Sequence, residues 1–354
     1  MEKPIIALTQ GDTNGVGLEI VVKALAPEGM CDLITPVIFA NKKLMAQTIS
    51  ALKGENLKFY PVESAADARP GRVNLVNVGD APISPSYGHP TPESGRAAFL
   101  SLEAACDAVL SGDVDAIVTA PISKEAIQND DFRFPGQTEY LEAKFASEGE
   151  KARMILFNDD LRVALLTTHL PVAEVAAHVT KKNIIEAAES LNASLRRDFG
   201  LERPKIAVLS LNPHCGDGGL IGREEKEEII PAIAELSDKG ILAFGPYAAD
   251  GFFANGSRRN FDGILAMYHD QGLAPFKALA GASGVNFTSG LDCVRTSPDH
   301  GTAYDIAGQW CADPASMRNA IFKACDIIRA RDFFDEASEN PLPTSVQKVS
   351  NKPQ

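Results

Sequence analysis

Short apolar runs alternate along the chain with longer segments whose apolar residues recur at helical spacing. The runs predict strands at 5–9, 33–40, 73–78 and 116–119, and again at 206–211, 264–268 and 285–287. The longer segments predict helices over about 18–25, 42–52, 182–199, 224–239 and 316–330. Strands that alternate with helices in this way are typical of an α/β protein built on a largely parallel sheet.

Capping and turn residues add a helix and a hairpin to this pattern. Thr91 and Pro92 predict a helix start, because Thr is a favourable N-cap and Pro fits the first helical position. The polar turn Asn158-Asp159-Asp160 separates the β-type runs 154–157 and 163–168, which predicts a hairpin. From about Glu336 the sequence becomes polar and loses its periodicity, so we expect a disordered tail.

The composition is that of a globular protein with room for about two domains. The 354 residues are 45% hydrophobic and 23% charged, which excludes a disordered or fibrous chain. The formal net charge of −13 argues against nucleic acid or an anionic membrane as the main partner. A small anionic ligand remains compatible with this charge, because a few local cations can hold it.

The N-terminal residues and the cysteines indicate a cytoplasmic protein. The apolar run at 4–8 is too short for a signal peptide, and no stretch approaches the ~20 apolar residues of a membrane span. The six cysteines are scattered and form no CxxC pair, so we expect reduced thiols.

Three histidines that follow predicted strands are candidates for a shared metal site. His169, His214 and His269 each lie at or just past the end of a β-type run. Ligands of open α/β sheets bind at the carboxyl ends of strands, where three imidazoles could converge on a divalent ion such as Zn²⁺. Their separations of 45 and 55 residues match no local metal motif. Three unrelated histidines that hydrogen-bond within their own loops therefore remain the alternative.

Glycine-rich and basic segments accompany these histidines. The turn 11–17 is neither a dinucleotide nor a nucleotide fingerprint, and its glycines fit a tight turn as well as a ligand contact. Lys277 and Arg295 follow His269 along the chain, with Asn286 between them. A Lys and an Arg beside a metal could hold a phosphate or a carboxylate, Arg in a bidentate manner.

Taken in order, these loops resemble the 4-hydroxythreonine-4-phosphate dehydrogenase family of pyridoxal phosphate biosynthesis. The similarity extends from Thr9 to about Arg331. Its markers are 11–17, Thr119-Ala120-Pro121 with Lys124, Thr138-Glu139, 168–171, 211–214, 267–272, Arg295-Thr296-Ser297 and 299–303. The segments 11–20 and 300–308 are also similar to the wider isocitrate and isopropylmalate dehydrogenase group.

The resemblance implies two α/β domains with a cleft between them, the chain crossing over and returning. We therefore expect 1–133 and 302–335 to form the first domain, and 134–301 to form the second and carry the metal ligands. Residues 336–354 would be the disordered tail. The segment Phe134-Pro135-Gly136 is the best candidate for the boundary.

The resemblance also implies roles for individual residues. His169, His214 and His269 match divalent-metal ligands of a site completed across a homodimer interface. The other expected site residues are substrate-binding (Gln137, Thr138, Lys277, Asn286 and Arg295), cofactor-binding (Gly284, Asp299, Gly301 and Thr302) or acidic and close to the metal (Asp250 and Asp270). Asp250, Asp270 and Lys277 are the candidates for proton transfer, with a merely solvated carboxylate as the alternative for each aspartate.

Position 137 departs from the family pattern. The family usually has His before the Thr-Glu pair, and this chain has Gln137. Gln can donate a hydrogen bond to a phosphate or a hydroxyl, but it cannot carry a proton. An acid–base role at this position is therefore not expected, and the identity of the substrate is left open.

The function implied is oxidation of 4-phosphooxy-L-threonine at C3, followed by decarboxylation to 3-amino-2-oxopropyl phosphate. NAD or NADP would accept the hydride, and the metal is expected to be Zn²⁺, with Mg²⁺ or Co²⁺ as alternatives. A paralogous dehydrogenase of 4-phospho-threonate, 4-phospho-erythronate or a ring diol stays open because of Gln137. A non-catalytic metal- or phosphate-binding protein is a second alternative, against which the intact set of site residues argues.

Overall fold

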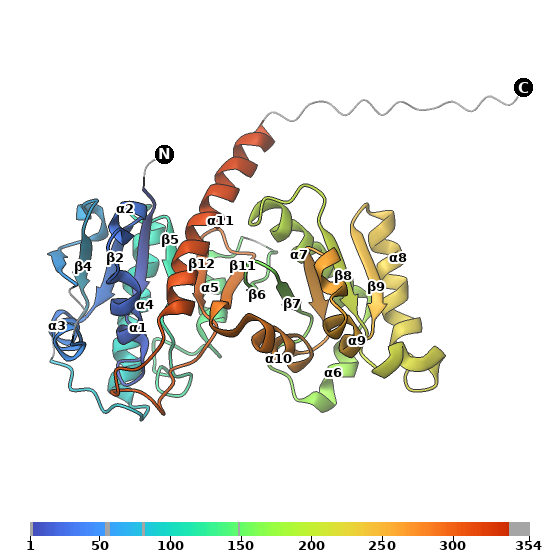
Figure 1. The fold of residues 1–354 in the computed structure, drawn as a ribbon, viewed down its shortest axis with the longest axis horizontal. Coiled ribbons are helices and arrows are strands. Elements are labelled where there is room, and N and C mark those ends of the chain that lie inside the picture. Colours follow the sequence, from blue (N-terminus) through green and yellow to red (C-terminus); the bar gives the residue numbers. More distant parts are fainter. Residues whose placement is uncertain (1–2, 54–56, 80–81, 148, 340–354) are drawn as a thin grey trace, which may run out of the picture.

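A computed structural model describes residues 3–53, 57–79, 82–147 and 149–339, in which one 12-stranded sheet runs through the molecule (Figure 1). The strand order is β3-β4-β2-β1-β5-β12-β11-β6-β7-β10-β8-β9. The strands are β1 Ile5–Thr9, β2 Thr35–Ala40, β3 Phe59–Val62, β4 Val73–Asn77, β5 Ala116–Val118, β6 Arg153–Phe157, β7 Arg162–Leu165, β8 Lys205–Leu209, β9 Leu242–Tyr247, β10 Gly263–Ala266, β11 Val285–Ser289 and β12 Val294–Pro298.

The sheet is parallel towards both ends and antiparallel in the middle. β12 and β11, β11 and β6, and β6 and β7 pair antiparallel, whereas the other neighbouring strands of the sheet pair in parallel. The strands at the two ends therefore run in opposite directions. Since β7, β10 and β8 are parallel neighbours, the loops that carry His169, His269 and His214 leave the sheet at the same edge, as the sequence predicts.

Helices cover both faces of the sheet. One face carries a continuous apolar core, which packs against α1 Gly17–Leu25, α3 Lys42–Ala51, α7 Lys181–Arg197, α8 Ile230–Asp238 and α11 Ala315–Glu339. On the opposite face one core packs against α4 Pro92–Leu110 and α5 Gln137–Phe145, and a separate core packs against α9 Ala249–Ala254 and α10 His269–Ala280. The gap between these two cores exposes β12, β11 and β6 to a ligand.

Strand alternation assigns the side chains to the two faces. On β1, Ile6 and Leu8 belong to the continuous core and Ala7 to the opposite one. On β8, Ile206 and Val208 face the continuous core while Ala207 and Leu209 face α9 and α10. Successive side chains of a strand point to opposite faces, so apolar runs such as these are needed where both faces are covered.

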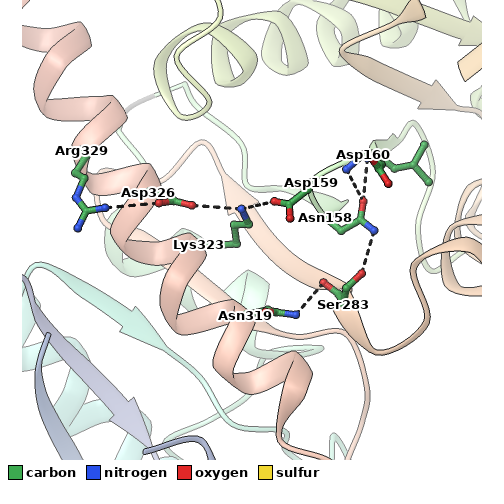
Figure 2. Close-up of polar contacts among 9 residues, drawn as sticks. Asn158, Asp159, Asp160, Ser283, Asn319, Lys323, Asp326 and Arg329 are labelled. Atoms are coloured by element: carbon green, nitrogen blue, oxygen red, sulfur yellow. Dashed lines mark hydrogen bonds and ion pairs between the residues drawn. The ribbon is translucent and has the colours of Figure 1, made fainter. Parts of the chain in front are cut away.

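Helix α11 crosses the middle of the sheet and is tied to the β6–β7 hairpin. Nζ of Lys323 lies 2.6 Å from Asp159 in the hairpin turn and 3.3 Å from Asp326 on its own helix (Figure 2). In the same view Ser283 links Asn319 to Asn158 through hydrogen bonds. These contacts fix α11 to the part of the sheet that begins at β6.

Farther along α11 a buried ion pair continues this attachment. Nε of Arg331 donates to Asp198 at the end of α7 over 2.7 Å, and both side chains are almost inaccessible to solvent. Arg197 and Asp335 form a second pair between the same helices at the surface. Helix α11 is thus held at several points along its length.

Most predicted elements are confirmed, including the helix capped by Thr91 and the 154–168 hairpin. The pattern did not predict the strands β3, β9 and β12 or the helices α5, α9 and α10. The strand expected at 33–40 begins only at Thr35, because Met30–Leu33 forms a short helix, α2. The disordered tail expected from Glu336 is wrong for 336–339, because α11 continues to Glu339, and the rest of that prediction, 340–354, lies outside the described residues.

The division into domains at 134 and 302 stays a prediction. Hydrogen bonding of the sheet continues across the proposed boundary, since β12 pairs with β5 on one side and β11 on the other. Within the described residues, no helix combines the length and the apolar character that a bilayer crossing needs.

Candidate functional site

The gap between the two cores holds a hollow of about 260 Å³. Its floor is formed by residues of the three central strands, and its walls by α5, by α10 and by the segments around 120, 169 and 300. The lining residues from the strands and these two helices are Met154, Leu156, Asn286, Arg295, Ser297, Pro298, Gln137, Thr138, Glu139, His269, Leu273 and Lys277. Most of the residues predicted from the sequence therefore meet at one place.

Arg295 lies at the floor of the hollow and is held by neutral side chains. It projects from β12 on the side of the gap, and the residue is only 4% exposed. Its guanidinium donates to the hydroxyls of Thr119 (2.7 Å) and Thr288 (2.9 Å) and to the amide oxygen of Gln137 (3.0 Å). Among the described residues it has no carboxylate partner, and burial lowers its pKa to about 10.

A buried cation without a counter-ion is costly unless a ligand supplies the negative charge. With its pKa at about 10, Arg295 is still charged at neutral pH. The hollow is therefore suited to an anionic group such as a phosphate, which can accept several hydrogen bonds from a planar guanidinium.

Gln137, at the first position of α5, is oriented by two hydrogen bonds. Its amide nitrogen donates to the backbone oxygen of Ala120 over 3.1 Å, and its oxygen accepts from Arg295. The side chain thus supports the guanidinium from one side. Because the amide is uncharged, it does so without repelling Arg295.

Asn286 and Lys277 bring further polar groups to the same hollow. The side-chain oxygen of Asn286 is buried and has no hydrogen-bond partner within the described residues. Buried polar atoms are normally paired, so an unpaired acceptor on a residue that lines a hollow favours a ligand with a donor there. Lys277 reaches the hollow from α10 and Thr138 from α5, so all five predicted substrate-binding residues line it.

His169 and His269 lie side by side at this hollow. Their ring centroids are 6.1 Å apart. Nδ1 of His269 lies 2.7 Å from Asp270, an arrangement that favours the tautomer protonated at Nδ1 and leaves Nε2 available to a metal. Burial, with a contribution from Lys124, lowers the pKa of His169 and so favours the neutral imidazole that metal binding requires.

His214 lies elsewhere in the same chain. It lines a second hollow, of about 510 Å³, together with Asp250, Tyr268 and Gln271. Within the part of the chain that the structure describes, no three His, Cys, Asp or Glu side chains come close enough to hold a metal ion. One chain therefore brings two of the predicted imidazoles together, and the third lines a different hollow.

The expected cofactor residues lie around the segment after β12. Asp299 and Gly301 line the first hollow, and Gly284 packs against Asp299 so closely that a Cβ would lie 2.2 Å from its carboxylate. The backbone oxygen of Thr302 accepts from Val16 over 3.0 Å. The glycine-rich turn 11–17 thus packs against the 302–304 segment, which is further fixed by a 2.8 Å hydrogen bond from Tyr304 to Asp12.

The close approach of these segments explains the glycines of the turn. A Cβ on Gly15 would lie 2.7 Å from the oxygen of Thr302, and Gly11 has a φ of +68°. Both positions exclude larger side chains for reasons of packing and backbone conformation.

Some residues of the hollow were not selected from the sequence as site residues. Thr119 and Thr288 hold the guanidinium of Arg295, and Ser297, Glu139 and His300 line the hollow. Thr288 could have been found, because it lies two residues after Asn286 on a strand and so shares its face. Thr119 directly follows β5 and belongs to a family marker, but its contact with Arg295 is not visible in the sequence.

Comparisons with known proteins show the family to which the chain belongs. The family model described as "Pyridoxal phosphate biosynthetic protein PdxA" matches residues 32–324. The 4-hydroxythreonine-4-phosphate dehydrogenase of Bacteroides thetaiotaomicron is 50% identical over 337 residues, covering 95% of this chain and 92% of the relative. A putative D-threonate 4-phosphate dehydrogenase of Oceanobacillus iheyensis is 36% identical, covering 92% and 98%.

The solved structures include a similar fold. The crystal structure of 4-hydroxythreonine-4-phosphate dehydrogenase from Klebsiella pneumoniae aligns with a TM-score of 0.79 at 32% identity. The alignment covers 92% of this chain and the whole of that one. The predicted α/β fold is confirmed.

Proposed function

Because the chain belongs to the PdxA family of pyridoxal phosphate biosynthetic proteins, dehydrogenases that use a nicotinamide cofactor and a divalent metal, we propose that it oxidises 4-phosphooxy-L-threonine. Oxidation at C3 is followed by decarboxylation to 3-amino-2-oxopropyl phosphate. The observation that carries this proposal is the buried, carboxylate-free guanidinium of Arg295 beside a pair of imidazoles in one hollow.

The cationic and polar side chains of the first hollow would bind the substrate. Arg295 and Lys277 would neutralise the phosphate, and Thr138 and Asn286 would add hydrogen bonds. Gln137 would act by holding Arg295 in place. A phosphate bound here would orient the substrate so that its carbon chain extends toward His169 and His269.

His169 and His269 are the ligands that this chain offers to a metal, and Zn²⁺ suits imidazole nitrogen best, with Mg²⁺ or Co²⁺ as alternatives. When bound, the metal would lower the pKa of the C3 hydroxyl and fix its oxygen, and NAD or NADP would accept the hydride. The segment with Gly284, Asp299, Gly301 and Thr302 would position that cofactor.

A homodimer would complete the metal site. We infer that His214 of the partner subunit approaches the His169–His269 pair, since within one chain it lies at a different hollow. Apolar side chains are exposed beside both parts of the proposed metal site. Val172 is 79% exposed near His169, and Leu220 is 84% exposed in the loop of His214. Exposed apolar groups next to incomplete sites favour an interface there.

Proton transfer has three candidates. Asp270 lies against His269, and Lys277 lines the hollow. Asp250 lies with His214 and would reach the site only from the partner subunit. Among them, Asp270 combines a carboxylate with direct access to the imidazole pair, so it is the preferred proton acceptor.

The test is turnover of 4-phosphooxy-L-threonine, followed by nicotinamide absorbance, with and without a chelator. We expect turnover that the chelator abolishes and that an added divalent metal restores. Absence of turnover with this substrate at saturating metal would contradict the proposal.

Phospho-threonate oxidation is the alternative substrate chemistry. It is favoured by the O. iheyensis relative, whose name gives D-threonate 4-phosphate, and by Gln137. The two substrates differ in the group at C2, an ammonium or a hydroxyl, while both carry the phosphate that Arg295 would bind. The ratio of kcat/KM for the two substrates decides between them.

A further inference from the structure

His214 lies in an unusual left-handed turn. Residues 214–218 all have positive φ, with values of 52° for His214, 54° for Cys215 and 43° for Asp217. An L-residue in this conformation costs roughly 1–2 kcal/mol. Such strain persists only where the surrounding structure enforces it, and it commonly marks functional positions.

Glu225 holds the segment that leads into this turn. This residue is 2% exposed, and its Oε1 accepts from the backbone nitrogens of Leu211 (2.9 Å) and Asn212 (2.8 Å). Its Oε2 accepts from the side-chain amide of Asn212 over 3.0 Å. Within the described residues Glu225 has no basic partner, so backbone and amide donors satisfy its carboxylate.

Close packing around Glu225 leaves the turn little freedom. A Cβ on Gly216 would lie 2.6 Å from Oε2 of Glu225, and one on Gly222 would lie 2.2 Å from the side-chain nitrogen of Asn212. The same amide also donates to Glu224 over 2.7 Å. The segment before His214 is therefore held from both sides.

A local irregularity of the helix accompanies this arrangement. Residues Glu225–Ile229 form a π-helical turn before α8. Such turns are rare, and they frequently occur at functional sites. Here the irregular turn begins at the carboxylate that holds the loop of His214.

We propose that Glu225 is a positioning residue that holds His214 in the orientation needed to bind the divalent metal. The proposal rests on the proposed function, in which His214 is a metal ligand. Glu225 does not touch the metal; it fixes the backbone that leads to the imidazole. Without it the left-handed turn would relax, and binding would have to restore the strained conformation.

The test is the metal affinity of Glu225→Gln, measured by titrating the metal-free protein with Co²⁺ and following its visible absorption. The carboxamide of Gln would place an N–H donor against the side-chain NH₂ of Asn212. The Asn212 amide cannot rotate to accept from it without losing its hydrogen bond to Glu224. We expect Co²⁺ binding to be about 10–100-fold weaker, the usual effect of removing a group that orients a ligand. The unfolding temperature of the metal-free variant, measured alongside, shows that the variant is folded under the conditions of the titration.

Two further variants control the measurement. Glu227→Gln changes the same helix, but the Glu227 side chain is 60% exposed and, among the described residues, pairs only with Arg223 at the surface, so it should leave Co²⁺ affinity unchanged. His214→Ala gives the affinity expected when the ligand itself is lost. Should Glu225→Gln fail to fold, Asn212→Ala removes the two side-chain hydrogen bonds that Asn212 donates to Glu224 and Glu225 and should weaken binding in the same direction.

The outcomes distinguish the positioning role of Glu225 from the role of His214 as a metal ligand. Unchanged affinity in Glu225→Gln, together with weak binding by His214→Ala, overturns the role of Glu225 and leaves the proposed function intact. Unchanged affinity in His214→Ala removes His214 from the metal site, and both the ligand set and the role of Glu225 are then wrong.

Discussion

Arg295 is a buried arginine whose hydrogen-bond partners are all neutral. Its partners are two hydroxyls and an amide, contributed by Thr119, Thr288 and Gln137. Each can accept a hydrogen bond, but none supplies a negative charge. The guanidinium is therefore positioned geometrically while its charge remains available to a substrate.

Replacing Arg295 by Lys should weaken binding of the phosphorylated substrate. A single ammonium cannot donate to all three supports and also bind phosphate in a bidentate manner. Loss of about 2 kcal/mol corresponds to a ~30-fold rise in KM, with a smaller change in kcat. The inhibition constant of inorganic phosphate should rise in parallel.

Thr288→Val is the matched control for this substitution. It removes one support of Arg295 but keeps the charge, so a rise in KM well below that of Arg295→Lys is expected. A KM in Arg295→Lys equal to that of the parent would show that the phosphate binds elsewhere.

At the scale of elements, α11 illustrates what periodicity does and does not predict. Apolar spacing predicts a helix over 316–330, and the structure has Ala315–Glu339. The additional turns are stabilised by pairs with another helix, Arg331 with Asp198 and Arg197 with Asp335. Those partners lie more than a hundred residues away in sequence, so no local pattern reveals them.

The Lys323–Asp159 contact should contribute modestly to stability. Lys323→Met should lower the free energy of unfolding at pH 7 by about 0.5–1 kcal/mol, because Asp159 is largely exposed and solvent screens the pair. Chemical denaturation measures this difference. Arg329→Met, which removes a weaker surface pair with Asp326, should have a smaller effect.

The pH dependence of this contribution has a definite sign. The hydrogen bond from Lys323 lowers the pKa of Asp159, so the folded state binds this proton less readily than the unfolded state. The stabilisation is present above the ordinary carboxyl pKa and is lost as the pH falls through the lowered one. The difference between Lys323→Met and the parent should accordingly vanish in acid, and a constant difference would contradict the assignment.

At the scale of the whole molecule, the separation of His214 from His169 and His269 is the central feature. The three loops leave the same edge of the sheet, yet two hollows divide the imidazoles. Under the proposed function, each metal site takes two ligands from one chain and one from the other. A dimer would then be required for activity itself.

Mixing inactive variants tests this arrangement. His169→Ala and His214→Ala should each be inactive, but a mixed dimer of the two has one site with all ligands intact. After random exchange of subunits, about a quarter of the parental activity is expected. Mixing His169→Ala with His269→Ala should recover nothing, because every site then lacks one ligand. Equal recovery in both mixtures, or in neither, would exclude a shared site.

The class of fold and most of the residues of the hollow can be predicted from the amino-acid sequence. Periodicities of 2 and 3.6 arise from backbone geometry, so alternation of strands and helices is readable without a structure. The ordered loop motifs supplied Gln137, Thr138, Lys277, Asn286 and Arg295, which the folded chain brings to one hollow. Short or mostly polar elements such as β3 were not readable in this way, because their stability comes from neighbours.

Tertiary structure alone decided how those residues act. The sequence shows Arg295 as a cation but not its burial without a carboxylate, which depends on strands far apart in the chain. It places Gln137 before a Thr-Glu pair but not against the guanidinium. The division of the histidines between two hollows, and the strained turn that Glu225 holds, likewise follow from packing between distant segments, and such contacts leave no periodic trace in the sequence.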